Sequence, residues 1–161
     1  MKDNLPGCNA KSVSMFTLGV GDVKRSIAFY EALGWECSPD SDPEMCMFVL
    51  SSNITIGLVP YDFLAKDALL PVDRKTRYRG FTMAINGASA EEVDALYERA
   101  IAAGAVEQQR PKWKDWGGHD GYSGYFLDPD GYVWEAAYAP TLRIDNDNRL
   151  LPRTKAEVQA G

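Results

Sequence analysis

Glu135 is the residue whose type and surroundings point most directly to chemistry. It stands in the run Val133-Trp134-Glu135-Ala136-Ala137, where its near neighbours are apolar. A carboxylate charge among apolar side chains is costly unless it meets a cation, a hydrogen-bond donor or open water, or unless its pKa rises. Such a group could serve as a general base, as a metal ligand, or as an acceptor that orients a bound molecule.

Two tryptophans precede Glu135 in residues 111–121. Trp113 and Trp116 stand close to Gly117-Gly118, which predicts a flexible loop carrying aromatic side chains. The two rings could cap the core or a subunit interface. They could also line the mouth of a cleft and stack on a planar or cationic ligand.

Tyr122, Tyr125 and His119 complete the candidate set. The two tyrosines follow the predicted loop, and their hydroxyls could orient a ligand in a cleft that also holds Glu135. His119 is the one histidine of the chain. It fits a surface loop residue, a ligand contact or an acid–base group, since an imidazole titrates near neutral pH.

A predicted β-hairpin over residues 122–138 positions Glu135. Asp128-Pro129-Asp130-Gly131 is a turn signal, because proline presets φ early in a turn and glycine accepts the positive φ that ends it. The flanking runs are rich in aromatic and β-branched residues, as strands are. Alternation along the second strand predicts two faces, Tyr132, Trp134 and Ala136 on one and Val133, Glu135 and Ala137 on the other.

The whole chain indicates an internal duplication. Strands are predicted in both halves, at residues 13–20, 35–37, 45–50 and 54–59, and then at 80–85, 105–109 and in the hairpin. Asp22 and Gly34 bound a helix in the first half, and Ser89 with Glu92 forms a capping box that opens one in the second. Two β-α-β-β-β units spaced by about 65 residues result, and neither alone holds much core.

These boundaries divide the chain into five parts: a flexible N-terminal lead at 1–12, a first module at 13–60, a connector at 61–79, a second module at 80–140 and a C-terminal extension at 141–161. The connector predicts a short helix near 62–69. Its cation-rich run, 74–79, is either a solvated segment or an arginine clamp for an anionic ligand. Within the extension we expect a small hairpin followed by frayed polar residues.

At the hairpin, the string from Gly124 to Tyr138 resembles the C-terminal hairpin of the vicinal oxygen chelate superfamily. That superfamily includes glyoxalase I, bleomycin-resistance proteins and extradiol dioxygenases. The duplicated order over roughly residues 13–140 agrees with it. The resemblance implies an α+β fold in which two tandem β-α-β-β-β modules form a curved mixed sheet around a cleft, with Glu135 at the floor of that cleft.

In the metal-dependent members that this chain resembles, the glutamate matching Glu135 is a metal ligand. Further ligands come from the start of each module's first strand and from each module's last strand. The matching positions here are Met15, then Gly80 or Phe81, then residues 54–59, and none of them is a histidine or an acid. A catalytic divalent ion typically needs about three protein ligands, so we expect no metal cofactor. Phe16 and Phe81 would make the cleft floor apolar instead.

Composition excludes other classes of protein. A formal charge of −6 disfavours nucleic acid as a partner, because phosphates demand clustered cations. No apolar run approaches the roughly 18 residues of a membrane span, and residues 1–12 lack the apolar core of a signal peptide. Cys8, Cys37 and Cys46 leave one thiol over in any pairing, which favours reduced cysteines. We therefore expect a cytoplasmic protein without membrane partners.

Three functions are compatible with these residues. The first is a metal-free binding protein, similar to the dimeric drug-sequestering members, that holds an aromatic or cationic compound between its modules. The second is a lyase or isomerase of the glyoxalase type, in which Glu135 acts as general base with Tyr125 or His119 as acid, or in which Glu135 is the sole remaining metal ligand. The third is an interaction module whose cleft is filled by its own side chains.

Overall fold

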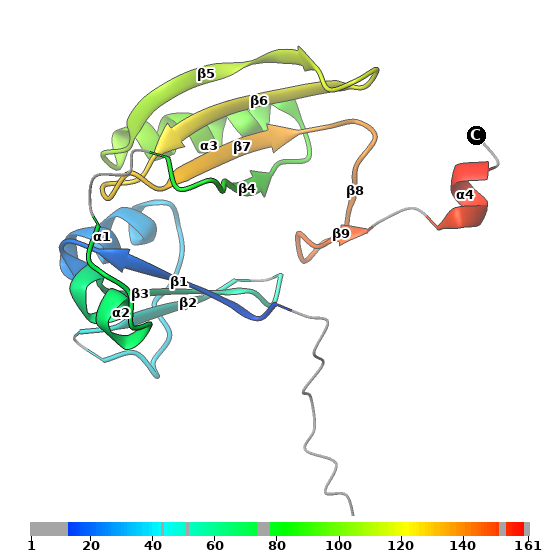
Figure 1. Ribbon diagram of the computed structural model, residues 1–161. Coiled ribbons are helices and arrows are strands. Elements are labelled where there is room, and N and C mark those ends of the chain that lie inside the picture. Colours follow the sequence, from blue (N-terminus) through cyan, green and yellow to red (C-terminus); the bar gives the residue numbers. More distant parts are fainter. Residues whose placement is uncertain (1–12, 43, 51, 74–77, 152–153, 160–161) are drawn as a thin grey trace, which may run out of the picture.

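The computed structural model describes residues 13–42, 44–50, 52–73, 78–151 and 154–159. The predicted flexible lead at 1–12 lies outside the described residues, as do residues 74–77 of the cation-rich run. Figure 1 shows two sheets, one from each half of the chain, with the C-terminal extension lying to the side of both.

The first half consists of β1 (Met15–Val20), α1 (Val23–Ala32), β2 (Cys46–Val49) and β3 (Thr55–Pro60). β3 pairs parallel to β1 and antiparallel to β2, which gives the sheet order β1-β3-β2. The Asp22 carboxylate accepts the Arg25 N–H at 3.1 Å, and Gly34 takes a φ of 95° just after the helix. Both predicted boundaries of this helix are thus confirmed.

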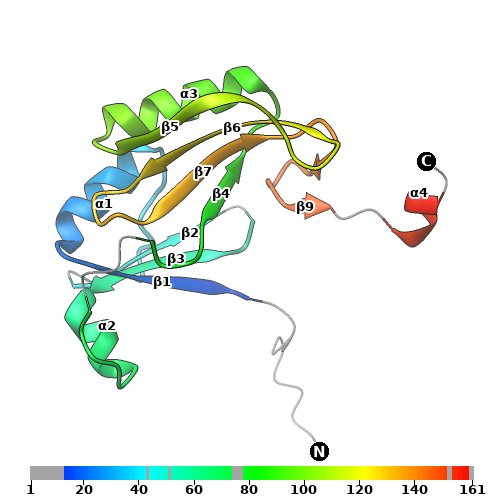
Figure 2. The same cartoon turned by 45° about the horizontal axis from the view of Figure 1, so that its top comes forward.

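The second half consists of β4 (Met83–Asn86), α3 (Ala90–Ala102), β5 (Val106–Asp115), β6 (Asp120–Leu127) and β7 (Val133–Tyr138). Its sheet order is β4-β7-β6-β5, with β4 parallel to β7. Each half therefore pairs its first strand parallel to its last, which confirms the α+β fold built from two tandem units. Figure 2 shows α3 covering one face of the second sheet.

Two predicted segments differ from the structure. The strand expected at 35–37 is reduced to a single bridge between Cys37 and Phe48. The loop expected at 111–121 is mostly strand, because β5 runs to Asp115 and β6 starts at Asp120. Lys112 and Lys114 are two residues apart with Trp113 between them, a strand pattern that outweighed the glycine pair, which occupies only the turn.

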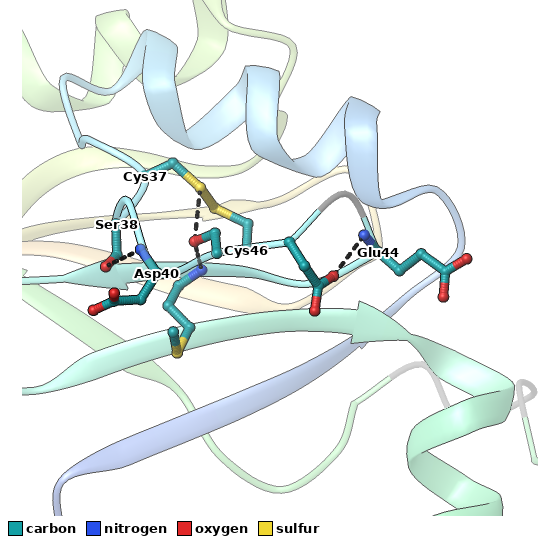
Figure 3. The surroundings of a disulfide bond; sticks show 8 residues. Cys37, Ser38, Asp40, Glu44 and Cys46 are labelled. Atoms are coloured by element: carbon teal, nitrogen blue, oxygen red, sulfur yellow. Dashed lines mark hydrogen bonds between the residues drawn. A yellow bond between two sulfur atoms is a disulfide. The ribbon is translucent and has the colours of Figure 1, made fainter.

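Cys37 and Cys46 form a disulfide, so the expectation of reduced thiols at these positions was wrong (Figure 3). Their Cα atoms lie 6.1 Å apart, because the bridge from Cys37 to Phe48 brings this segment against β2. The Ser41 hydroxyl lies 3.4 Å from the Cys37 sulfur and accepts the Met47 N–H at 2.9 Å. Counting cysteines could not reveal this pairing, which depends on strand neighbours.

The connector and the C-terminal extension add small elements. The predicted connector helix is present as α2 (Tyr61–Asp67), and the predicted hairpin as β8 (Arg143–Ile144) with β9 (Leu150–Leu151). The last residues were expected to be frayed, but they form α4 (Lys155–Gln159). The Glu157 carboxylate accepts the Thr154 N–H at 2.7 Å, and the Thr154 hydroxyl accepts the Glu157 N–H at 3.3 Å, which completes a capping box. The boundaries of the five parts stay predictions.

Asp128, the first acid of the predicted turn, joins the two halves. Its side chain is buried, and it accepts hydrogen bonds from the Tyr30 hydroxyl at 2.5 Å and from the Asp130 and Tyr132 N–H groups at 2.9 Å each. The Trp134 indole N–H donates to the Tyr30 oxygen at 3.2 Å. Tyr30 belongs to α1, so the turn of the second half is bonded to the helix of the first.

Asp130, the second acid of the turn, binds the start of the same helix. One of its oxygens accepts the Gly21 N–H at 2.7 Å and an Arg25 N–H at 2.9 Å. The other accepts the hydroxyl of Ser26, a fully buried side chain, at 2.7 Å. We call Asp128, Asp130 and their partners in α1 the inter-half lock.

Over the described ranges, no helix is long and apolar enough to cross a bilayer.

Candidate functional site

A cavity of about 760 Å³ lies between the two halves. It runs along the free edge of β4, and residues 81–86 all line it. Four aromatic side chains contribute from both halves: Phe16, Trp35, Phe81 and Trp134. A space of this size with mostly apolar walls is typical of a site for a small organic molecule.

The aromatic wall is held rigidly. Trp35 stacks on Tyr30 with ring centroids 5.1 Å apart and meets Trp134 edge-on at 5.4 Å. Phe16 and Phe81, in contrast, are 40% and 39% exposed, so their rings offer apolar surface to a guest. The hypothesis of a cleft filled by its own side chains is not supported by this open space.

The polar groups of the cavity lining are few. The charged one is Glu36, and the neutral ones are Ser52, Thr82, Asn86 and Asn148. A single carboxylate among aromatic rings favours a cationic guest, because both the charge and the ring faces attract cations.

Glu135 does not line this cavity. Alternation along β7 points Trp134 toward α1 and the cavity, and it points Glu135 to the opposite face of the sheet. There Glu135 is the strand partner of Tyr125 of β6, and the two side chains share this face. We call this side of the second sheet the Glu135 face.

Lys114 of β5 lies on the Glu135 face. Its ammonium nitrogen is 2.8 Å from the hydroxyl oxygen of Ser123, a fully buried residue, and 4.5 Å from the centre of the Tyr125 ring. Lys114, Ser123, Tyr125 and Glu135 form what we call the Glu135 cluster. The carboxylate thus shares its face with a phenol and with a cation, Lys114, whose charge it attracts.

Burial changes the acid–base properties of the cluster. It raises the pKa of Tyr125 to about 12, and the neighbouring Glu135 carboxylate adds to the rise. Burial also lowers the pKa of Lys114; the nearby charge of Lys112 lowers it further, whereas Glu135 opposes the shift. The cluster therefore holds a phenol that resists ionisation beside an amine that loses its proton more easily than usual.

The Tyr125 phenol is expected to ionise near pH 12, and Glu135→Gln is expected to move its pKa back toward the ordinary value of 10.0. The substitution removes the negative charge that opposes formation of the phenolate. Titration of ¹³Cζ-labelled tyrosine by NMR measures both values, with Tyr125→Phe to assign the signal. Glu91→Gln, a change on the exposed start of α3, serves as the control. An unchanged Tyr125 pKa in Glu135→Gln would contradict a contribution of the Glu135 carboxylate to the raised value.

The other predicted site residues divide between the two faces. Trp116 lies on the Glu135 face, with its ring against Gly121, the strand partner of Lys114. Trp113 packs on Tyr122 at 5.3 Å and on Tyr138 at 6.3 Å on the α3 side, where the Tyr122 hydroxyl donates to Asp94 at 2.9 Å. These contacts give Trp113 and Tyr122 a packing role. Their binding of a ligand stays a prediction.

His119 occupies the turn at the end of the β5–β6 hairpin. It is exposed, and its carbonyl accepts the Trp116 N–H at 2.8 Å. Phe16 and Phe81 lie along the cavity, on the side of the second sheet away from the Glu135 face. The structure therefore does not bring the predicted residues together at one floor.

The residues present do not fit a catalytic metal. The near neighbours of Glu135 on its face are Tyr125, its strand partner, and Lys114, whose ammonium group repels a metal ion rather than binding it. In the described ranges, no three side chains of His, Cys, Asp or Glu gather closely enough to hold an ion. A divalent ion needs about three such donors.

Sequence reasoning missed three residues of these sites: Trp35, Glu36 and Lys114. The first two were assigned to a strand, although the structure places them at the cavity wall. Lys114 was assigned to a loop. Its spacing of two from Lys112 and its place among strand-forming aromatics were the available signals.

Comparisons with known proteins agree with this architecture. A family model described as "Glyoxalase/Bleomycin resistance protein/Dioxygenase superfamily" matches residues 12–136. A search of curated proteins found no significant match. A glyoxalase-related enzyme from Fulvimarina pelagi is similar in structure, with 29% identity and a TM-score of 0.79, over 89% of this chain and 99% of that one.

Two further solved structures share the fold. A glyoxalase/bleomycin resistance protein/dioxygenase family enzyme from Burkholderia phytofirmans PsJN is 21% identical, with a TM-score of 0.65, over 78% of this chain and 96% of that one. A lactoylglutathione lyase from Agrobacterium tumefaciens is 19% identical, with a TM-score of 0.57, over 79% and 92%. At these identities the likeness extends to the fold alone.

Proposed function

Because this chain belongs to the glyoxalase/bleomycin resistance protein/dioxygenase superfamily, we propose that it binds a small aromatic or cationic organic molecule in the cavity between its halves, without a catalytic metal. The observation that supports this most strongly is the cavity itself, about 760 Å³ with four aromatic rings and one carboxylate in its lining. Aromatic rings bind planar guests by stacking, and Glu36 supplies the charge that a cation requires.

A homodimer is part of this proposal. Large apolar side chains stand exposed on the first sheet and its approach, including Val13 at 62% and Val49 at 62%. Exposed apolar surface of this kind is typical of protein–protein contacts. Light scattering of the purified protein measures the mass, and a monomer at micromolar concentration would argue against this part.

Phe81→Ala and Phe16→Ala are each expected to weaken the binding of an aromatic cation about fivefold, because each removes one stacking ring worth roughly 1 kcal/mol. Both rings are partly exposed, so the folded state should tolerate the changes. Quenching of tryptophan fluorescence gives the affinity, because Trp35 and Trp134 line the cavity. A series of aromatic amines and quaternary ammonium compounds supplies the probes.

Phe63→Ala is the matched control, since Phe63 of α2 is 60% exposed and does not line the cavity. It should leave the affinity unchanged. If none of the compounds quenches the wild-type protein, or if all three variants bind equally, the cavity is not the binding site.

The strand-paired residues Tyr125 and Glu135 support a second candidate, a lyase or isomerase of the glyoxalase type. Glu135 would remove a proton, and Tyr125, whose pKa is raised to about 12, would stay protonated and able to donate. Turnover of a 2-oxoaldehyde in the presence of a thiol would show this activity. Loss of turnover in Glu135→Gln, with the fold intact, would favour the enzyme over the binding protein.

A further inference from the structure

The Glu135 face holds an amine in an environment unlike that of a surface lysine. The Lys114 nitrogen sits between the buried Ser123 hydroxyl at 2.8 Å and the Tyr125 ring at 4.5 Å. On the other side, the Trp116 ring packs over Gly121, the residue paired with Lys114 across the two strands. The side chain is only partly exposed, whereas Lys112, two residues earlier on the same face, is exposed.

Two features of this environment favour nucleophilic chemistry. Partial burial disfavours the ammonium form, and Lys112 adds a second positive charge nearby; both effects increase the neutral amine at a given pH. Glu135 acts in the opposite sense, but it also supplies a carboxylate that can accept and return a proton. The Tyr125 ring beside the amine, and the Trp116 ring near the paired Gly121, offer surface to an apolar or aromatic substituent.

We propose that Lys114 is a nucleophilic amine that captures an aldehyde or ketone carrying an apolar or aromatic group, and that it forms an imine on the Glu135 face. The neutral amine adds to the carbonyl carbon, which forms a C–N bond as the C=O π bond breaks, and the oxygen takes up a proton. Loss of that oxygen as water, together with the remaining proton of the nitrogen, leaves the C=N bond. Tyr125 and Glu135 are the groups placed to carry these protons.

This site is separate from the cavity, because Trp134 and Glu135 point to opposite faces of β7. Binding in the cavity and imine formation at Lys114 can therefore succeed or fail independently. Imine formation at the Glu135 cluster requires no metal ion.

The test treats the full-length protein with benzaldehyde and sodium cyanoborohydride, which reduces an imine to a stable secondary amine. Peptide mass spectrometry then gives the extent of modification at each lysine. At short times and neutral pH, we expect the label at Lys114 to exceed that at Lys112 several-fold, because partial burial increases the neutral amine at Lys114. Lys24 and Lys66, both exposed on helices of the first half, give the background.

Matched variants complete the experiment. Lys114→Arg keeps the charge and should abolish most of the fast labelling, whereas Lys112→Arg should leave labelling at Lys114 unchanged within a factor of about two. Circular dichroism of both variants confirms that the fold is kept. Equal labelling of Lys114, Lys112, Lys24 and Lys66 would overturn the proposal, as would fast labelling that persists on other residues of Lys114→Arg.

Discussion

Asp128→Ala is expected to lower the free energy of unfolding by about 3–5 kcal/mol, the largest loss that we predict for a single side chain. The substitution removes the acceptor for the Tyr30 hydroxyl and for the Asp130 and Tyr132 N–H groups. These donors lie where water has little access, because Asp128 is 2% exposed and Tyr30 is fully buried. Urea unfolding followed by tryptophan fluorescence measures the change.

Asp40→Ala is the control for this prediction, since Asp40 is exposed in the turn before β2 and its carboxylate lies far from the lock. It should change the stability by no more than about 0.5 kcal/mol. A loss in Asp128→Ala as small as that of the control would show that the lock does not hold the two halves together.

The pH dependence of stability tests the same residue. Burial raises the pKa of Asp128 above its usual value in spite of three hydrogen bonds that lower it. Because the folded-state pKa of Asp128 is raised, the stability that its protonated form contributes is fully present below the unfolded-state pKa, about 3.9. This stability is lost as the pH rises through the folded-state pKa. Asp128→Asn should remove this part of the pH dependence, which urea titrations at several pH values reveal.

Gly124→Ala is expected to destabilise the protein by about 3 kcal/mol, because its new methyl group would collide with backbone. A Cβ at this position would lie 2.7 Å from the Pro111 nitrogen and 2.8 Å from the Gln109 oxygen. The register of the β5–β6 pair shifts between Gln109 and Lys112, and the backbone of β5 approaches Gly124 of β6 closely at this irregularity. Neither backbone atom can move without disturbing the hairpin.

Gly121→Ala offers a comparison three residues away on the same strand. There the Cβ would lie 2.4 Å from the Trp116 ring, but that ring is 38% exposed at the end of the hairpin and can turn aside. We expect a loss of stability of about 1 kcal/mol or less, together with a change in Trp116 fluorescence. Thermal unfolding of both variants by circular dichroism separates the two cases. A smaller loss of stability in Gly124→Ala than in Gly121→Ala would be incompatible with the close approach of the β5 backbone to Gly124.

Trp134 connects the lock to the cavity. Trp134 donates its indole N–H to Tyr30 within the lock, and its ring lines the cavity. The position of the aromatic wall therefore depends on the contact between the turn of the second half and α1 of the first. Because the lock fixes the two halves relative to each other, the cavity is formed before a ligand binds.

Local features of this protein could be predicted from its sequence because they depend on residues a few positions apart. Asp22 and Gly34 bound α1 as expected, and Ser89 caps α3 by accepting the Glu92 N–H at 3.3 Å. The Asp-Pro-Asp-Gly turn lies between β6 and β7, with Gly131 at a φ of 79°. Strand alternation likewise predicted that Trp134 and Glu135 face opposite ways.

Other features were decided only by the tertiary structure. The sequence predicts that Trp134 and Glu135 diverge, but not which of the two faces the other half of the chain. Tyr30 and Asp128 are 98 positions apart, and no local pattern announces that one will bind the other. The pairing of Cys37 with Cys46 and the cavity beside β4 likewise depend on strand neighbours. Capping and alternation are local preferences of the backbone, whereas the lock, the disulfide and the cavity exist only once distant segments have packed together.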